Sequence, residues 1–370
     1  MILYLALTVV TVWLAWHVTS REQETMPIRL PQTASSLTRS KTINGICLGA
    51  IFFLLFVVSA FRTGIGNDYE RYVEFVHLIE FNQMVPTEIG FNLLVKLING
   101  LSGFENAKLM FAIYAFVTIL LFLVGMVRQS VDFPLTFFLF MTLGYYFQTM
   151  NTVRYYLALA IAFVCFRYVL KGQYVRFVLL TLLGAAFHKS LLVILPLYLI
   201  AKVPWKKWML AVGALLSISF VLFQDFYLKV VVFLYPSYRD TEYLEGGTSI
   251  PNILRCFAVL VFGLLYYQKC IETNEENLFY FQLNLGACVL YTCCSFLPII
   301  SRIGYYLTIS HILFIPSILQ GIEREQTRIP AKLWRILIVL AGCGYFALFL
   351  WKAGDVAVGL LPYETWLFVL

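Results

Sequence analysis

Three arginines lie where apolar segments begin, a position in which a guanidinium can bind an anion at a membrane edge. They are Arg154 in Asn-Thr-Val-Arg, Arg255 in Asn-Ile-Leu-Arg and Arg302 in Ser-Arg. A guanidinium near hydrocarbon is costly, so three of them need a reason beyond anchoring. Each is expected in the first turn of a helix, where unpaired backbone N–H groups and the helix dipole also attract negative charge. The pattern predicts a site for a phosphate-bearing substrate.

The elements that must position these arginines are membrane helices. Of the 370 residues, 61% are hydrophobic and 13% are charged, and the mean hydropathy is +0.82. The apolar runs continue for about 17 to 20 residues, which fits helices that cross a bilayer and is too long for barrel strands. The sequence therefore predicts an all-α polytopic membrane protein with about 12 transmembrane helices. Residues 1–370 are expected to form a single integral membrane domain.

The charged and cysteine residues exclude other classes. The net charge of +7 comes from short loops between apolar runs, so it indicates membrane orientation and predicts no nucleic-acid partner. The cysteines lack the paired spacing of a zinc site or a disulfide framework. We expect neither a metal nor a cofactor.

Helices are expected near residues 2–19, 43–61, 107–127, 134–150, 152–170, 208–223, 252–268, 279–298, 302–320 and 334–351. The basic connection 20–42 is assigned to the cytoplasm. Two further helices of about 17 residues each are predicted on either side of Phe187-His188-Lys189. The count of crossings then places His188 with the outer arginines, at the apex of a hairpin that faces outward or dips partway into the bilayer.

Two outer segments, 62–106 and 224–250, are long enough to form a roof over a site. Within the first, apolar residues follow helical spacing and predict two amphipathic helices on the membrane surface. Their apolar faces would consist of Tyr72, Phe75, Val76 and Ile79, and of Phe91, Leu94, Val95 and Ile98.

The chain resembles the EpsG group of Wzy-type polysaccharide polymerases over nearly its whole length. The resemblance depends on the order of short motifs: Arg-x-Gly-x-x-Asn-Asp-Tyr, Glu-x-Gly-Phe, Asn-x-x-Arg, Phe-His-Lys-Ser, a late Arg-x-x-x-Tyr and a terminal Pro-Tyr. The matching residues are Arg62, Asp68, Tyr69, Glu88, Phe91, Asn151, Arg154, His188, Arg302, Tyr306 and Pro362-Tyr363.

The resemblance implies polymerisation of undecaprenyl-diphosphate-linked oligosaccharide repeat units at the periplasmic or outer face of the bacterial inner membrane. It also implies a GT-C-like helical fold and a partner of the Wzz type that sets chain length. Membrane lipid is the other expected partner.

Candidate roles follow from side-chain chemistry. Arg62, Arg154, Arg255 and Arg302 are expected to bind the diphosphate, because planar guanidinium groups grip it with paired hydrogen bonds. His188, Asp68 and Glu88 are the candidate bases for the acceptor hydroxyl, and His188 is favoured because imidazole titrates near neutral pH. Tyr69, Tyr235, Tyr238, Tyr305 and Tyr306 are candidates to stack on sugar rings.

Structural roles compete with these assignments. The arginines can extend to lipid phosphates, the tyrosines can belong to the interfacial aromatic belt, and Asp68 can cap a helix. Two rival functions also remain. A flippase for lipid-linked oligosaccharide needs basic groups but a site that extends to both faces. A ligase or acyltransferase at the same face uses the same kind of donor with a different acceptor.

Overall fold

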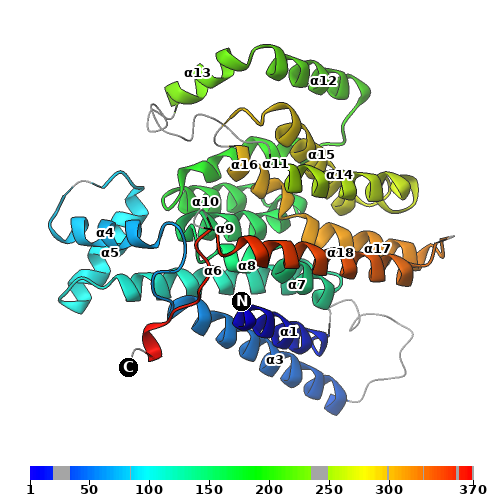
Figure 1. Ribbon diagram of the computed structural model, residues 1–370. Helices are drawn as coiled ribbons and strands as arrows, with labels where there is room; N and C mark the ends of the chain where they lie inside the picture. Colours follow the sequence, from blue (N-terminus) through cyan, green and yellow to red (C-terminus); the bar gives the residue numbers. More distant parts are fainter. Residues whose placement is uncertain are drawn as a thin grey trace. The chain divides into compact units, whose positions relative to one another are not determined.

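Figure 1 shows the computed structural model of the chain. The structure describes all residues except 20–33, 84, 235–248, 298–299, 328, 356–357 and 369–370. In these described parts every regular element is a helix, and the only extended pairing is an isolated bridge between Arg62 and Thr365. The all-α prediction is confirmed. The chain forms two compact units, Met1–Arg167 with Val175–Leu191 and Thr327–Leu370, and Tyr168–Tyr174 with Leu192–Gln326.

The first unit contains the segment 62–106 and the helices on both sides of it. Its helices are α1 (Ile2–Trp16), α3 (Ala34–Ala60), α4 (Tyr69–Glu80), α5 (Ile89–Ser102), α6 (Ala107–Gln129), α7 (Phe133–Thr142), α8 (Tyr145–Gln148), α9 (Val153–Leu170) as far as Arg167, most of α10 (Tyr174–Ala185) and α18 (Ala331–Lys352). Helix α3 packs against α1 and α6, and α7 packs against α1 and α18. The helices α4 and α5 lie side by side and both contact α6.

The second unit is organised around one central helix. Its helices are α11 (Ile194–Lys202), α12 (Lys207–Leu222), α13 (Gln224–Leu234), α14 (Ile250–Leu265), the π-helix η4 (Tyr267–Ile271), α15 (Glu275–Cys293), α16 (Ile300–Thr308) and α17 (His311–Arg324). Helix α15 contacts α11, α12, α14, α16 and α17. It buries polar residues as well as apolar ones, among them Asn284, whose side chain bonds His311.

Several helices are long and apolar enough to cross a membrane. Among the described residues, five helices qualify singly: Lys41–Ala60, Ala107–Gln129, Val153–Leu170, Ile300–Arg324 and Ala331–Lys352. A sixth span results if α12 and α13, which meet at a bend of 88°, are counted together. The chain is therefore a multi-pass membrane protein. Other crossings predicted from the sequence fall on shorter apolar helices such as Ile2–Trp16 and Ile250–Leu265.

The predicted helices agree in position with the observed ones, but some are interrupted. The predicted helix 134–150 is broken at Gly144, where φ is +80° and a Cβ atom would lie 3.0 Å from the Phe349 ring. The predicted helix 302–320 is divided at Ile309–Ser310. The chain does break at Phe187–His188, but α10 and α11 have 12 and 9 residues and are shorter than predicted.

The helices α4 and α5 exist as predicted, yet most of their predicted apolar faces are turned into the protein. Tyr72, Phe75 and Val76 of α4 are buried, as are Phe91 and Val95 of α5. Since α4 and α5 pack on each other and on α6, these residues form a small core.

Helix α5 carries a second apolar stripe on its exposed side. Ile89, Leu93, Leu97 and Leu101 follow one another at four-residue spacing and are 67%, 61%, 58% and 80% exposed. Residues four apart lie on one face of a helix. An exposed apolar stripe of this length on a membrane protein indicates contact with lipid hydrocarbon.

We predict that Leu97 faces lipid and that its neighbour Lys96 faces water. A spin label placed at Leu97→Cys in nanodiscs should be more accessible to dissolved oxygen than to a water-soluble nickel chelate, and Lys96→Cys should show the opposite order. The exposed Cys343 is first replaced by Ser. Equal accessibility at both positions would contradict lipid contact through this stripe.

Candidate functional site

Residues from three segments meet at the start of α9. Glu88 is the N-cap residue of α5, Arg154 is the second residue of α9, and His188 to Ser190 follow the end of α10. All of them belong to the first unit. The segment 62–106 and the chain after α10 are thus brought to one helix terminus, where Glu88 contacts Arg154 and the backbone amide of Lys189, the residue after His188.

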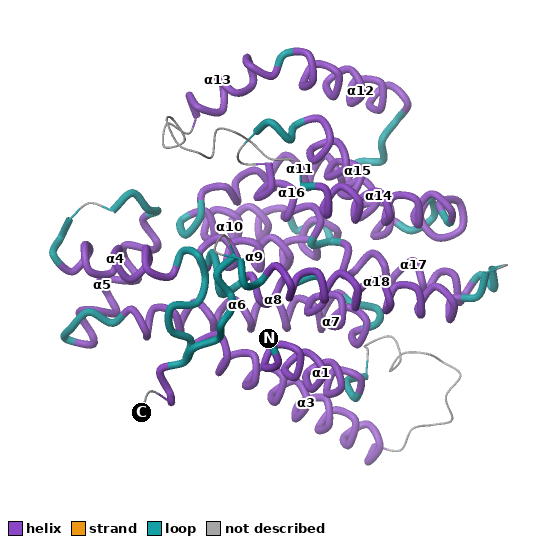
Figure 2. The backbone as a smooth tube through the Cα atoms, in the orientation of Figure 1, coloured by secondary structure: helices purple, strands orange, loops and turns teal. Residues whose placement is uncertain are grey.

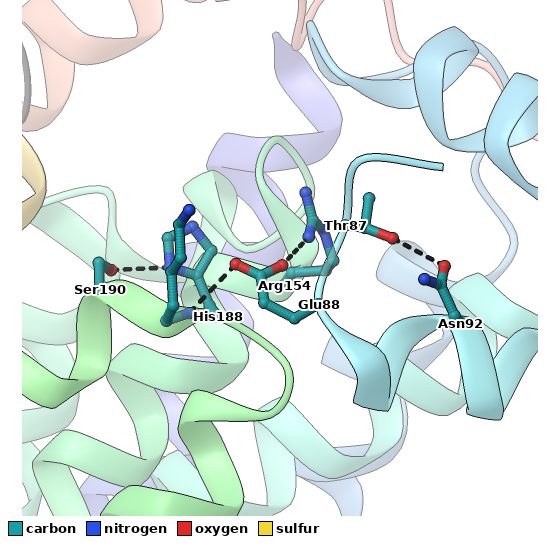
Figure 3. Close-up of polar contacts among 7 residues, drawn as sticks. Thr87, Glu88, Asn92, Arg154, His188 and Ser190 are labelled. Atoms are coloured by element: carbon teal, nitrogen blue, oxygen red, sulfur yellow. Dashed lines mark hydrogen bonds and ion pairs between the residues drawn. The ribbon is translucent and has the colours of Figure 1, made fainter. Parts of the chain in front are cut away.

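An ion pair between Glu88 and Arg154 forms the centre of this site. Oε2 of Glu88 accepts a hydrogen bond from Nη1 of Arg154, and both side chains are 16% exposed. Oε1 of the same carboxylate accepts from the backbone N–H of Lys189 at 3.1 Å. Figure 3 shows the carboxylate between the guanidinium and the segment that carries His188. One carboxylate therefore ties α5, α9 and the chain after α10 together.

Aromatic rings hold the guanidinium of Arg154 from the sides. Its Cζ lies 5.6 Å from the ring centroid of Tyr72 and 5.3 Å from that of Phe91. Ring faces attract a cation by about 0.5–2 kcal/mol, more when water is excluded. Burial raises the pKa of the Tyr72 hydroxyl, with Arg154 acting in the opposite direction. The Arg154 side chain is therefore fixed in place by Glu88 and by two rings of the α4–α5 core.

Backbone contact reinforces the same junction. The N–H of Gly90 donates to the carbonyl of Ala186 at 2.7 Å. A Cβ atom on Gly90 would lie 2.6 Å from that carbonyl oxygen, which is too close for any side chain. Next to it, the Thr87 hydroxyl donates to Oδ1 of Asn92 at 2.8 Å and closes the turn before α5 (Figure 3).

His188 has its own partner beside the ion pair. Its Nδ1 lies 2.7 Å from Oγ of Ser190, and its ring meets the edge of Tyr155 at a centroid distance of 5.4 Å. The side chain is half-buried. If Nδ1–H donates to Ser190, Nε2 carries the lone pair that a general base requires.

Arg62 is placed differently from the sequence-based expectation. It is 1% exposed, donates to the carbonyls of Ser59 and Ile65, and stands 4.7 Å above the ring of Phe111. Burial lowers the pKa of Arg62 to about 10, although surrounding tyrosine hydroxyls oppose this shift. A guanidinium so enclosed stabilises the turn after α3 and offers no exposed surface to a substrate.

Asp68 and Tyr69 lie on the same turn. Asp68 is half-buried at the N-cap position of α4, but its side chain makes no capping hydrogen bond to this helix. Tyr69 is 7% exposed and stacks on Phe111 at a centroid distance of 4.6 Å, so this ring face is occupied within the protein.

The remaining candidates belong to the second unit or fall outside the description. Arg255 is buried, donates to Asn252 and Thr308, and lies 5.9 Å from the ring centroid of Tyr305. Tyr306 is fully buried, and its carbonyl accepts from Tyr198. The half-buried Arg302 is the third residue of α16.

Tyr235 and Tyr238 lie outside the described residues. Within the described ranges, no group of three or more histidine, cysteine or acidic side chains is arranged to hold a metal ion.

Sequence reasoning missed several residues at the site. Lys189 and Ser190 lie within the Phe-His-Lys-Ser motif, but only His188 received a role, because the contributions of the others come from a backbone amide and from the imidazole partner. Gly90 gave a visible signal, since the Glu-x-Gly spacing places a residue without a side chain at the helix start. The contact with Ala186 had no such signal.

Fold and site together define a multi-pass membrane protein with a paired guanidinium and carboxylate where a span begins. The EpsG family matches residues 45–365, and the chain belongs to this family. Membership suggests an exopolysaccharide or O-antigen polymerase. No curated protein and no solved structure matched the chain.

We predict energetic coupling between Glu88 and Arg154. Glu88→Gln leaves a shielded guanidinium without its counter-ion, so Glu88→Gln and Arg154→Met should each destabilise the protein, while the double variant should lose less than their sum. Contacting residues couple by about 0.5–3 kcal/mol, and unfolding of the four proteins in detergent measures the coupling. The exposed pair His77–Glu105 is the matched control, with an expected coupling below about 1 kcal/mol. Additive effects at Glu88 and Arg154 would contradict this prediction.

We further predict that Gly90→Ala separates α5 from the chain after α10. The added methyl group would press against the Ala186 carbonyl, whereas Gly100→Ala in the same helix meets no atom within 4 Å. Gly90→Ala should lower the melting temperature and Gly100→Ala should hold or raise it, because alanine favours helix. Equal melting temperatures would show that the close contact is not maintained.

Proposed function

We propose that the protein is a polysaccharide polymerase, a glycosyltransferase that joins undecaprenyl-diphosphate-linked oligosaccharide repeat units and releases undecaprenyl diphosphate. The reaction is proposed to take place at the periplasmic or outer face of the bacterial inner membrane. The observation that carries this proposal is the Glu88–Arg154 pair with His188 beside it, in a chain whose family suggests this class of polymer synthesis.

The site lies where a lipid-linked substrate can reach it. Arg154 lies at the start of a span, and α5, which carries the exposed apolar stripe, begins at the same place. A polyprenyl diphosphate has a hydrocarbon tail that stays in the bilayer and a charged head group at the membrane edge. A site at the end of a span matches both parts.

Arg154 is the residue proposed to stabilise the leaving group. Breaking the bond between the anomeric carbon and the diphosphate develops negative charge on the diphosphate oxygens, and a fixed guanidinium stabilises this charge in the transition state. Glu88 and the two rings orient Arg154 before the substrate binds, so little reorganisation is needed. The prediction that Arg255 and Arg302 bind diphosphate concerns the second unit and is not part of this site.

His188 is the proposed general base. Attack by the acceptor hydroxyl on the anomeric carbon requires transfer of the hydroxyl proton. Ser190 orients the imidazole, in the way that a hydrogen bond at one ring nitrogen selects the tautomer at the other. Both oxygens of Glu88 already accept hydrogen bonds from Arg154 and Lys189, which favours an orienting role for Glu88.

A polymerisation assay tests the proposal. Purified protein in nanodiscs is incubated with its lipid-linked repeat unit, with and without EDTA, and products are separated by length. We expect a ladder of longer lipid-linked glycans and release of undecaprenyl diphosphate in both conditions. His188→Ala and Arg154→Ala should lower the rate by about 100-fold or more, the usual effect of losing a general base or a charge-stabilising group.

Matched substitutions distinguish chemistry from folding. His77→Ala removes an exposed histidine of α4, and Arg167→Ala removes an arginine from the other end of α9; both should keep the ladder. If the ladder disappears only when EDTA is present, the reaction requires a metal ion and the expectation of a metal-independent enzyme is wrong. Transfer of intact lipid across liposomes without a ladder would instead indicate a flippase, and transfer of glycan to another acceptor would indicate a ligase.

A further inference from the structure

The C-terminal segment 358–366, here called the C-terminal strap, runs along the turn that follows α3. In Figure 2 the turn and the strap are drawn as loops up to Trp366, where the short helix η5 (Trp366–Phe368) begins. The N–H of Thr63 donates to the carbonyl of Glu364 at 3.0 Å, and the N–H of Trp366 donates to that of Phe61 at 3.2 Å. This pairing forms the antiparallel bridge between Arg62 and Thr365.

Side chains add to this attachment. The Thr365 hydroxyl donates to the Phe61 carbonyl at 2.7 Å, and the Tyr363 hydroxyl donates to the Val58 carbonyl at 3.0 Å. From α1, the Tyr4 hydroxyl donates to the Leu360 carbonyl at 2.8 Å. The strap is therefore hydrogen-bonded to α1 and to the C-terminal end of α3, which lie more than 300 positions away in the sequence.

Gly66 is the point at which the strap, the turn and the start of α9 meet. Its N–H donates to the Gly359 carbonyl at 2.7 Å. On its other side, a Cβ atom would lie 2.3 Å from the carbonyl oxygen of Met150 and 3.0 Å from Cα of Asn151. Its φ of +100° is also a conformation that favours glycine. Met150 and Asn151 lie three and two residues before the start of α9, the helix that carries Arg154.

The geometry points to the C-terminal strap as a positioning element for Arg154. The strap holds the turn through Gly66, and the turn presses against the backbone that starts α9. Asn151 adds a direct link, since its Nδ2 donates to the Val358 carbonyl at 3.5 Å. The inference rests on the proposed function only for the role of Arg154 in stabilising the leaving group. The strap residues are positioning residues, which contact no substrate and act through the start of α9.

Arg62 has a defined part in this arrangement. It closes the turn by donating to Ser59 and Ile65, and the same residue pairs with Thr365 of the strap. Its enclosure among aromatic residues keeps water from these backbone bonds. Arg62, the first arginine of the family motifs, thus stabilises the turn and its pairing with the strap.

Two pairs of full-length variants test the inference. Gly359→Ala places a methyl group 3.2 Å from the backbone nitrogen of Asn67 at a φ of +59°, whereas Gly354→Ala meets no atom within 4 Å. Thr365→Val removes the hydroxyl while keeping the shape, and Thr365→Ser keeps the hydroxyl. Hydrogen exchange is measured by mass spectrometry in the peptides that contain Thr63, Gly66 and Asn151, together with the kcat and KM of polymerisation.

We expect Gly359→Ala and Thr365→Val to speed exchange about tenfold in these peptides, with no change in α18. Turnover should fall by about tenfold or more while KM for the donor changes less than about twofold, because a displaced charge-stabilising group affects the transition state most. Gly354→Ala and Thr365→Ser should behave like the wild type.

Faster hydrogen exchange that is confined to the strap itself would overturn the inference. It would also be overturned if kcat fell equally in all four variants, or if kcat stayed unchanged in Gly359→Ala and Thr365→Val while the wild type is active. The exchange measurement needs no substrate. If the wild type makes no polymer but the strap variants still loosen the peptides around Gly66 and Asn151, the proposed function fails and the mechanical coupling stands.

Discussion

A guanidinium at the start of a membrane span needs a compensating charge, and the first unit is organised around meeting that need. Removing a charge from water without a partner costs several kcal/mol, so Arg154 requires Glu88 and the surrounding rings. Glu88 can reach it only if α5 begins beside α9. The Lys189 amide on the second carboxylate oxygen then fixes the chain after α10. One pairing thereby sets the relative position of three segments.

Two glycines make this close assembly possible. Gly90 and Gly66 each lie where a Cβ atom would come within 3 Å of a carbonyl oxygen, at Ala186 and at Met150. Close backbone approach allows direct N–H to carbonyl bonds in regions that carry little regular structure. Such bonds matter near a bilayer, because irregular backbone there must be satisfied within the protein. The site is thus supported by backbone contacts as much as by side chains.

The division of roles among charged residues follows from burial. Arg62 and Arg154 both belong to family motifs, yet Arg62 bonds backbone carbonyls in a closed aromatic surrounding and Arg154 pairs with a carboxylate that remains partly exposed. In the second unit Arg255 bonds neutral side chains of Asn252 and Thr308. Of these three arginines, Arg154 combines a fixed geometry with access, which is the combination that stabilising a developing anion requires.

The sequence by itself determined the class, the family and the approximate helix positions, because hydrophobic run length and motif order are local properties that need no knowledge of packing. It also offered Glu88, Arg154 and His188 as candidate site residues, among a larger set that included Arg62, Arg255 and Arg302. Only the tertiary structure decided that Glu88 is the partner of Arg154, that Arg62 is enclosed, and that the strap near Gly359 reaches the turn at Gly66. These features depend on contacts between residues far apart in the chain, and such contacts leave no periodic pattern in a single sequence.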